Sequence, residues 1–168
     1  MKTAIISSET SEKHLTGDGH PEQPKRILSI KKKLKIRKDL IWQEPDKVPS
    51  EILEITHSEE YIKNITKSFP TDGLKFLDGD TVISPGSKNA IYDAAGSVIR
   101  AINGIENGEF KNAFCAVRPP GHHAEKNKAM GFCVINQAGV ALNYLVKKFK
   151  YNKIACVDFD VHWGNGNY

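Results

Sequence analysis

The chain has 168 residues, with 24 Lys and Arg against 20 Asp and Glu, a formal charge of +4. Its 39% hydrophobic and 26% charged residues are ordinary for a soluble globular protein, and the length fits one domain with a real core. No apolar run approaches the roughly 20 residues that a membrane span needs, so we expect no membrane association.

Cysteine content and charge distribution indicate the cellular compartment and the kinds of binding partner to expect. The three cysteines are odd in number and lie in apolar surroundings, which indicates reduced thiols in a cytoplasmic protein: Cys115, Cys133 and Cys156. The N-terminal "MKTAIISSETSEK" has too short an apolar run for a signal peptide. Much of the positive charge lies in "KKKLKIRK" (31–38), where no aromatics are interleaved. This favours an exposed helix face over a nucleic-acid site, so we expect no direct nucleic-acid binding.

The first half of the chain predicts a strand and two helices. The β-branched "TAIISS" (3–8) is typical of a short buried strand, and a loop rich in Gly and Pro follows it. Apolar residues at helical spacing predict a helix over about 25–37 and another over 57–68, with Ser58 as its N-cap. The stretch 69–86 is a long loop with several turn signals, and such loops are often functional.

The second half predicts alternating helices and strands. A strong helix begins at Ser87 and stops before Gly108, a strand covers 113–117, a helix runs from Asn136 to Lys148, and "KIACVDFDV" (153–161) predicts another strand. This alternation indicates an α/β fold with a mainly parallel sheet. Ligands in such sheets bind beyond the carboxyl ends of the strands, where "RPPGHHAE" (118–125) and "VDFDVHWGNGN" (157–167) are both expected to lie.

The stretch 157–167 has the pattern of a metal site. Side chains two apart in a strand share a face, so Asp158, Asp160 and His162 point to one side. Two carboxylates and an imidazole would repel and desolvate badly without a cation, and mixed N and O ligands suit zinc, with ferrous iron as an alternative. The pattern alone leaves open a solvated polar loop. The following Gly-Asn-Gly indicates a tight turn.

The adjacent histidines follow a Pro-Pro-Gly turn that can aim them separately. One histidine acting as a base beside another oriented by a carboxylate is a sound arrangement for acid–base chemistry near neutral pH. Taken alone, His122 and His123 could equally be surface or structural residues. In "GFCVIN" (131–136), the Gly permits close approach of the backbone to a ligand and the Phe could wall a channel, while plain core packing is the alternative.

Together these motifs resemble the zinc-dependent histone deacetylase family, including bacterial acetoin-utilisation proteins and acetylpolyamine amidohydrolases. "GHPEQPKR", "HSEEYI", "DTVISPGS" with "AAG", "RPPGHHA", "GFCVIN" and "VDFDVHWGNGN" follow the family's order through almost the whole chain. "RPPGHHA" and "GNG" are closer to the class II and bacterial branch. The resemblance implies an arginase/deacetylase-like fold, a mainly parallel sheet flanked by helices, with residues 1–168 as the N-terminal part of a single, truncated domain.

The resemblance also implies roles for the two stretches. Asp160 and His162 correspond to two protein ligands of the zinc ion. His123 corresponds to the general base, and His122 to its neighbour, which Asp158 orients. Asn165 stands where a side chain orients His123; several family members carry Asp there, so this partner is neutral.

Other positions correspond to the substrate channel and to an ion site. The resemblance implies that Phe132 forms one wall of the acyl-lysine channel, Gly131 its floor, and that Asp80 holds the substrate backbone. Arg26 matches a basic residue near an internal cavity below the metal. A structural potassium ion is implied near Asp158, Asp160 and His162. Trp163 departs from the His that is common at its position.

The implied reaction is metal-assisted hydrolysis of an acetylated lysine protein or an acetylated polyamine to acetate and an amine. The family's third zinc ligand, an Asp, and its transition-state-stabilising Tyr lie downstream of these motifs. We therefore expect residues 1–168 alone to be an inactive fragment of such an enzyme. A catalytically dead protein that binds acyl ligands or a partner is the alternative. A nucleotide-binding domain and a serine hydrolase are disfavoured because no G-x-G-x-x-G, G-K-[ST] or G-x-S-x-G motif is present.

Overall fold

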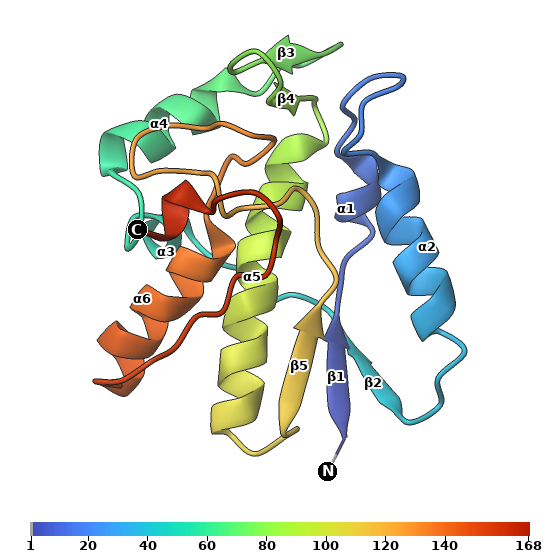
Figure 1. The fold of residues 1–168 in the computed structure, drawn as a ribbon, viewed down its shortest axis with the longest axis vertical. Coiled ribbons are helices and arrows are strands. Elements are labelled where there is room, and N and C mark those ends of the chain that lie inside the picture. Colours follow the sequence, from blue (N-terminus) through green and yellow to red (C-terminus); the bar gives the residue numbers. More distant parts are fainter. Residues whose placement is uncertain (1) are drawn as a thin grey trace.

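The computed structural model describes residues 2–168 and is built on a parallel three-stranded sheet (Figure 1). The strand order is β2 (Leu40–Gln43), β1 (Thr3–Ile6) and β5 (Asn112–Cys115). Thr3 pairs with Leu40 on one side and with Asn112 on the other. The sheet therefore confirms the expected parallel α/β class, although β2 had not been expected from the sequence.

Helices cover both faces of this sheet. On one face, Ile5 packs against Ile27 of α2 (Pro24–Leu34). On the other face, Ala4 and Ile6 pack against Ala101 of α5 (Ser87–Glu106). Because side chains alternate along β1, neighbouring residues pack on opposite faces of the sheet, one against α2 and the next against α5. This is the pattern of a strand that is buried on both faces. A short helix, α1 (Thr10–Lys13), follows β1.

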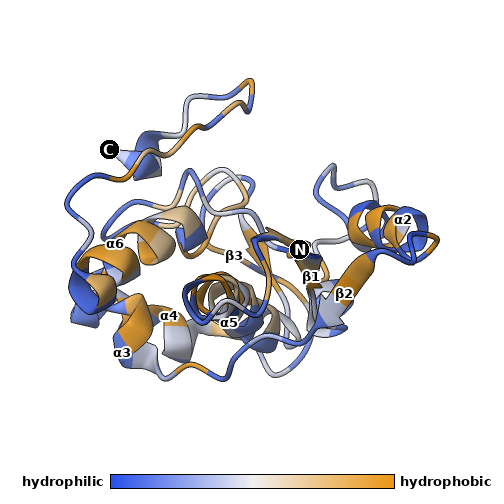
Figure 2. Cartoon of the chain, turned by 90° about the horizontal axis from the view of Figure 1, so that it is seen from below, coloured by the Kyte–Doolittle hydropathy of each residue, from blue (hydrophilic) through white to orange (hydrophobic). Residues whose placement is uncertain are grey.

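The largest core lies on the side of α5 that faces away from the sheet. There α3 (Ser50–Leu53), α4 (Glu59–Ser68) and α6 (Gln137–Phe149) pack around α5, as Figure 2 shows in a view from below. Two side-chain caps begin these helices: the Ser58 hydroxyl accepts the Tyr61 N–H, and the Asn136 amide oxygen accepts the Gly139 N–H. The cap predicted at Ser58 is confirmed.

The long loop predicted over 69–86 contains a small antiparallel hairpin, β3 (Lys75–Phe76) and β4 (Val82–Ile83). The short helix η1 (Asn165–Asn167) lies close to the end of the chain. No helix among residues 2–168 has the length and apolar character to cross a membrane.

The strand predicted over 153–161 is wrong. This segment is irregular, and no strand pairing involves it among the described residues (Figure 1). Val157, Phe159 and Val161 are 81%, 96% and 92% exposed. The alternation of polar and apolar residues is typical of a strand, but a strand forms only where a second strand supplies hydrogen-bond partners. In residues 2–168, β5 pairs with β1 and does not pair with this segment.

Candidate active site

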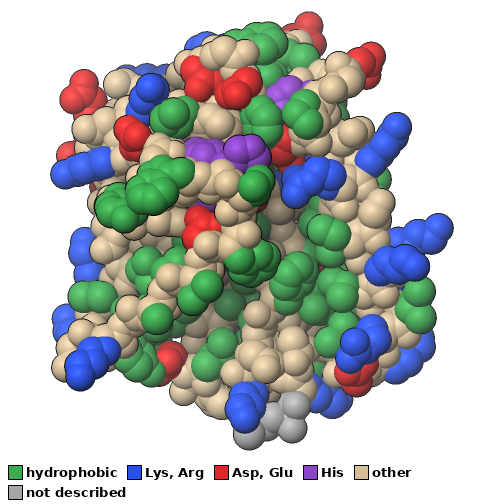
Figure 3. Space-filling view, in the orientation of Figure 1, with side chains coloured by type: hydrophobic (Ala, Val, Ile, Leu, Met, Phe, Trp, Pro, Cys, Tyr) green, Lys and Arg blue, Asp and Glu red, His purple; other side chains and the backbone are tan. Residues whose placement is uncertain are grey.

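A cavity of about 330 Å³ brings together most of the residues that the sequence singled out. It lies where the loop after β5 meets the α1–α2 loop, the start of α2, the β3–β4 loop and the segment after α6. Its lining comprises Pro21, Glu22, Arg26, Asp80, Pro120, His122, His123, Gly131, Phe132, Asp160 and His162. On the face shown in Figure 3, histidine side chains reach the surface with acidic side chains beside them.

The two adjacent histidines lie with their ring centroids 4.1 Å apart, and each is held by a different partner. His122 Nδ1 lies 3.0 Å from Asp158 Oδ2, and His123 Nδ1 lies 2.7 Å from Asn165 Oδ1. Since both partner atoms are acceptors, each histidine carries its proton on Nδ1, which leaves Nε2 as the basic nitrogen of the neutral ring. The structure therefore joins the two stretches in one site.

The acidic stretch forms successive turns instead of a strand face. Asp158 Oδ1 accepts the Asp160 N–H, and Asp160 Oδ1 accepts the His162 N–H at 2.8 Å. The hydrogen bond with His122 lowers the pKa of Asp158, and the Asp160 N–H lowers it further. The His162 N–H, followed by the His162 side chain, lowers the pKa of Asp160. Both carboxylates are therefore ionised near neutral pH.

The predicted metal ligands lie side by side at the cavity. His162 Nδ1 is 2.9 Å from Asp160 Oδ1, and the His162 ring centroid is 6.0 Å from that of His123. A carboxylate and an imidazole are donors that zinc accepts, but a catalytic zinc site uses three protein ligands. Within residues 2–168, no group of three or more His, Cys, Asp or Glu side chains is placed to hold a metal ion. The donors fit zinc in chemistry, and two of the usual three are present.

A strained turn places the predicted channel residues. Gly131 and Phe132 both have positive φ angles, 56° and 68°, and this conformation costs a non-glycine residue such as Phe132 roughly 1–2 kcal/mol. A hydrogen bond from the Phe132 N–H to Thr81 Oγ1 holds the turn against the β3–β4 loop. The Phe132 ring packs edge-on against His20, whose Nε2 lies 3.1 Å from the Asp80 carbonyl oxygen. Asp80 and Phe132 therefore lie on the same rim.

A buried ion pair at the wall of the cavity was not expected from the sequence. Arg118, directly before the Pro-Pro-Gly-His-His stretch, donates two hydrogen bonds of 2.6 Å to the carboxylate of Glu22. The exposed fractions are 1% and 3%. Arg26 donates to the same carboxylate at 2.8 Å, which ties the predicted basic residue to the cavity wall. The only sequence signal was the presence of opposite charges inside two Pro-rich loops.

Comparison with known proteins identifies the family. Residues 20–168 match the histone deacetylase domain. The chain belongs to the histone deacetylase family. The match covers the site loops and most of the fold described above.

The relatives extend well beyond the matched region. Histone deacetylase 5 of Arabidopsis thaliana is 36% identical over 98% of this chain and 27% of its own length. A probable deacetylase of Archaeoglobus fulgidus is 33% identical over 99% of this chain and 47% of its own. The crystal structure of the HDA15 HD domain superposes with a TM-score of 0.90 at 30% identity, over 99% of this chain and 48% of that one. The deacetylase fold is thus confirmed, and the chain spans about half or less of the length of these relatives.

Proposed function

We propose that this protein carries the acid–base residues of a zinc-dependent amidohydrolase. Such an enzyme removes acetyl or related acyl groups from lysine side chains or related amines. The observation that carries the proposal is the histidine pair, with each ring held through Nδ1, beside Asp160 and His162 in one cavity. Membership of the histone deacetylase family supports deacetylation as the class of reaction.

Each residue of the pair has a defined task in this proposal. His123, with Nδ1 bonded to the neutral Asn165, takes a proton through Nε2 from the attacking water. His122 is kept beside it by the ionised Asp158, and a protonated histidine of the pair returns a proton to the leaving amine. Acetate and a free amine are the products. General acid–base catalysis of this kind contributes roughly 10²–10⁴-fold to a rate.

Asp160 and His162 would hold the metal ion, zinc or alternatively ferrous iron. The chemistry that such an ion supplies is polarisation of the amide carbonyl and acidification of water. Oxygen atoms at Asp158, Asp160 and His162 would hold a structural potassium ion. With two metal donors from this stretch, residues 1–168 alone are proposed to have little or no deacetylase activity, because a catalytic zinc site uses three.

The rim residues define the proposed substrate. The Phe132 ring would wall a narrow channel for the aliphatic part of an acyl-lysine or an acetylated polyamine, with Gly131 at its floor and Asp80 binding the substrate backbone. We propose a cytoplasmic protein that binds neither nucleic acid nor membranes. A catalytically inactive protein that binds acyl ligands or a protein partner is the competing function, favoured because no group of three or more His, Cys, Asp or Glu side chains within residues 2–168 is placed to hold a metal ion.

Calorimetric titration of the chain with zinc, combined with an acetyl-lysine peptide assay, tests the proposal. We expect weak zinc binding that disappears in the double variant Asp160→Asn/His162→Ala, with peptide hydrolysis near the buffer rate. Zinc binding that survives the double substitution would refute the assigned ligands. Hydrolysis that is abolished by the double substitution would establish the deacetylase and refute the inactivity of residues 1–168.

A further inference from the structure

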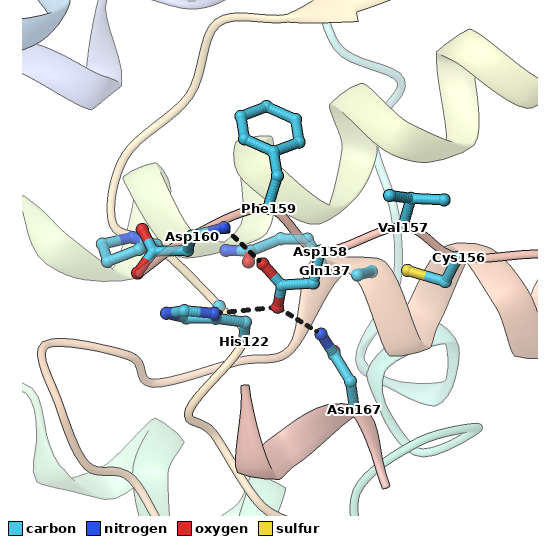
Figure 4. Close-up of a pocket in the computed structure, with 11 residues that line it drawn as sticks. His122, Gln137, Cys156, Val157, Asp158, Phe159, Asp160 and Asn167 are labelled. Carbon is cyan, nitrogen blue, oxygen red and sulfur yellow. Dashed lines mark hydrogen bonds and ion pairs between the residues drawn. The ribbon is translucent and has the colours of Figure 1, made fainter. Parts of the chain in front are cut away.

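The short helix η1 contains Asn165, which binds His123, and contacts Asp158, which binds His122. Asn165 Oδ1 accepts the hydrogen bond from His123, and the Gly166 N–H donates to the His122 carbonyl oxygen at 2.8 Å. Asn167 Nδ2 donates at 2.9 Å to Asp158 Oδ2, the same oxygen that pairs with His122 (Figure 4). A shift of these three residues would therefore disturb both imidazole rings.

Glycine at 166 is required by this arrangement. A Cβ atom there would lie 2.3 Å from the Ala124 carbonyl oxygen, closer than atoms approach without displacement. The backbone of η1 is thus packed directly on the loop that carries the histidine pair. This accounts for the tight turn that the Gly-Asn-Gly sequence indicated.

One buried side chain anchors η1 to the core. Asn136, fully buried at the start of α6, donates from Nδ2 to the Gly166 carbonyl oxygen at 2.7 Å and to Asn167 Oδ1 at 2.9 Å. Its Oδ1 accepts the Gly139 N–H at 2.8 Å, and its own backbone N–H donates to His57 Nε2. Every polar group of this amide side chain is therefore used, and two of its three bonds go to η1.

These bonds fix the direction of the Asn167 amide. Because Asn136 donates to Asn167 Oδ1, the NH₂ group of Asn167 must face the Asp158 carboxylate, which can only accept. A reversed amide would set two acceptor oxygens against each other and leave a polar group unpaired. The chain of bonds from Asn136 through Asn167 to Asp158 thus has a single orientation, and it ends at His122 Nδ1.

We infer that Asn136 and Asn167 are positioning residues of the histidine pair: Asn167 holds Asp158 on His122, and Asn136 holds η1 so that both His122 and His123 keep their Nδ1 protons. The inference rests on the proposed function, in which the unprotonated Nε2 of His123 acts as a base. Neither asparagine contacts the reacting atoms, and each acts through another residue.

Long-range ¹H–¹⁵N NMR spectra of the histidine rings in the 168-residue chain test this inference, since they show which ring nitrogen carries the proton. We expect the Nδ1–H form for both histidines in the wild type. In Asn167→Ala, His122 should give a mixture of the two tautomers while His123 is unchanged. In Asn136→Asp both should change, although Asp retains the helix cap through its carboxylate oxygen. Far-UV circular dichroism should be the same in all variants.

The exposed Asn64→Ala on α4 is the matched control, with both rings expected to match the wild type. An unchanged His122 spectrum in Asn167→Ala, or an equal change in Asn64→Ala, would overturn the inference. If Asn136→Asp fails to fold, Asn167→Ala decides the question, because Asn167 is only half-buried. The spectra need no catalysis, so failure of the positioning role is distinguishable from failure of the deacetylase assay.

Discussion

Arg118 and Glu22 form a bidentate ion pair at the wall of the candidate site, with both hydrogen bonds 2.6 Å long and both side chains almost fully buried. Burial by itself raises the pKa of Glu22, but Arg118, together with His14 and Arg26, lowers it below its ordinary value. The pair joins the α1–α2 loop to the loop that carries the histidines, across 96 positions of sequence. Its removal should therefore affect stability and the site together.

Replacing Glu22 with Ala should lower the free energy of unfolding by about 3–5 kcal/mol, since the Arg118 charge would remain buried without its carboxylate. Urea denaturation measures this change. Glu59→Ala is the control, because the Glu59–Lys63 pair on α4 is exposed and such pairs contribute about 0–1 kcal/mol. Equal losses of unfolding free energy in the two variants would show that the buried ion pair stabilises the fold no more than the exposed pair does.

The fold should become less stable in mild acid, because His14 is protonated more readily in the unfolded chain than in the folded one. Burial lowers the pKa of His14 from 6.5 to about 4, although Glu22 opposes the shift. Between these values the unfolded chain binds a proton that the folded chain does not. Stability is therefore fully present above about pH 6.5 and is lost as pH falls toward 4, by roughly 3 kcal/mol for this residue.

The matched variant for this pH dependence is His14→Asn, which can keep a hydrogen bond to Ser87 in place of the Nδ1 contact of 2.7 Å. Chemical denaturation at several pH values should give a flatter profile for the variant between pH 6.5 and 4. His57, whose pKa is also lowered by burial, leaves a dependence in the same direction in both proteins. Parallel profiles for wild type and variant would contradict the assignment to His14.

Gly131→Ala should displace His123, whereas Gly108→Ala should not. Both glycines have positive φ, 56° and 73°, so both substitutions carry a backbone cost of about 1–2 kcal/mol. A Cβ atom at 131 would lie 2.5 Å from His123 Cδ2, but at 108 it meets nothing within 4 Å. Thermal melts should show a loss of stability in both variants, larger in Gly131→Ala because His123 must move, and only Gly131→Ala should shift the His123 ring resonances. A shift of these resonances in both variants would refute the contact.

Phe159→Ser should reduce self-association of the chain at high concentration. Phe159 is 96% exposed between Val157 and Val161, and contiguous exposed apolar surface promotes association. Light scattering as a function of concentration measures the effect. Phe76→Ser is the control, since Phe76 is an exposed aromatic residue on β3, outside this segment. An equal effect in both would show that general hydrophobicity, and not this segment, drives association.

The sequence predicts those parts of the fold in which local pattern and packing agree. The α4 helix has both its cap at Ser58 and its apolar stripe, and the structure has both. The segment 153–161 has the alternation of a strand, but pairing depends on a distant partner that the local pattern cannot specify. The four residues of β2 lie between charged runs and carry too short a signal to stand out.

In the site, too, some contacts could be predicted from the sequence and others depend on distant partners. The family resemblance implied that Asp158 orients His122, and the two side chains lie 3.0 Å apart. The supports of that contact were not predicted: Asn136 is 31 positions from Asn167, and a hydrogen bond between two amides leaves no periodic signal. The residues that hold these supports in place, Asn136 and Asn167, are therefore the part of the site that the sequence did not predict.

The most direct test of the proposed deacetylase site is a chimera in which residues 1–168 replace the matching part of the probable deacetylase of Archaeoglobus fulgidus. The match covers 47% of the length of that protein. Hydrolysis of an acetyl-lysine peptide is measured with and without zinc. We expect zinc-dependent hydrolysis that falls by roughly 10²–10⁴-fold in His123→Ala, because His123 is the proposed general base. A folded, zinc-loaded chimera that does not hydrolyse the peptide, or one whose rate is unchanged by His123→Ala, would contradict the proposed role of His123.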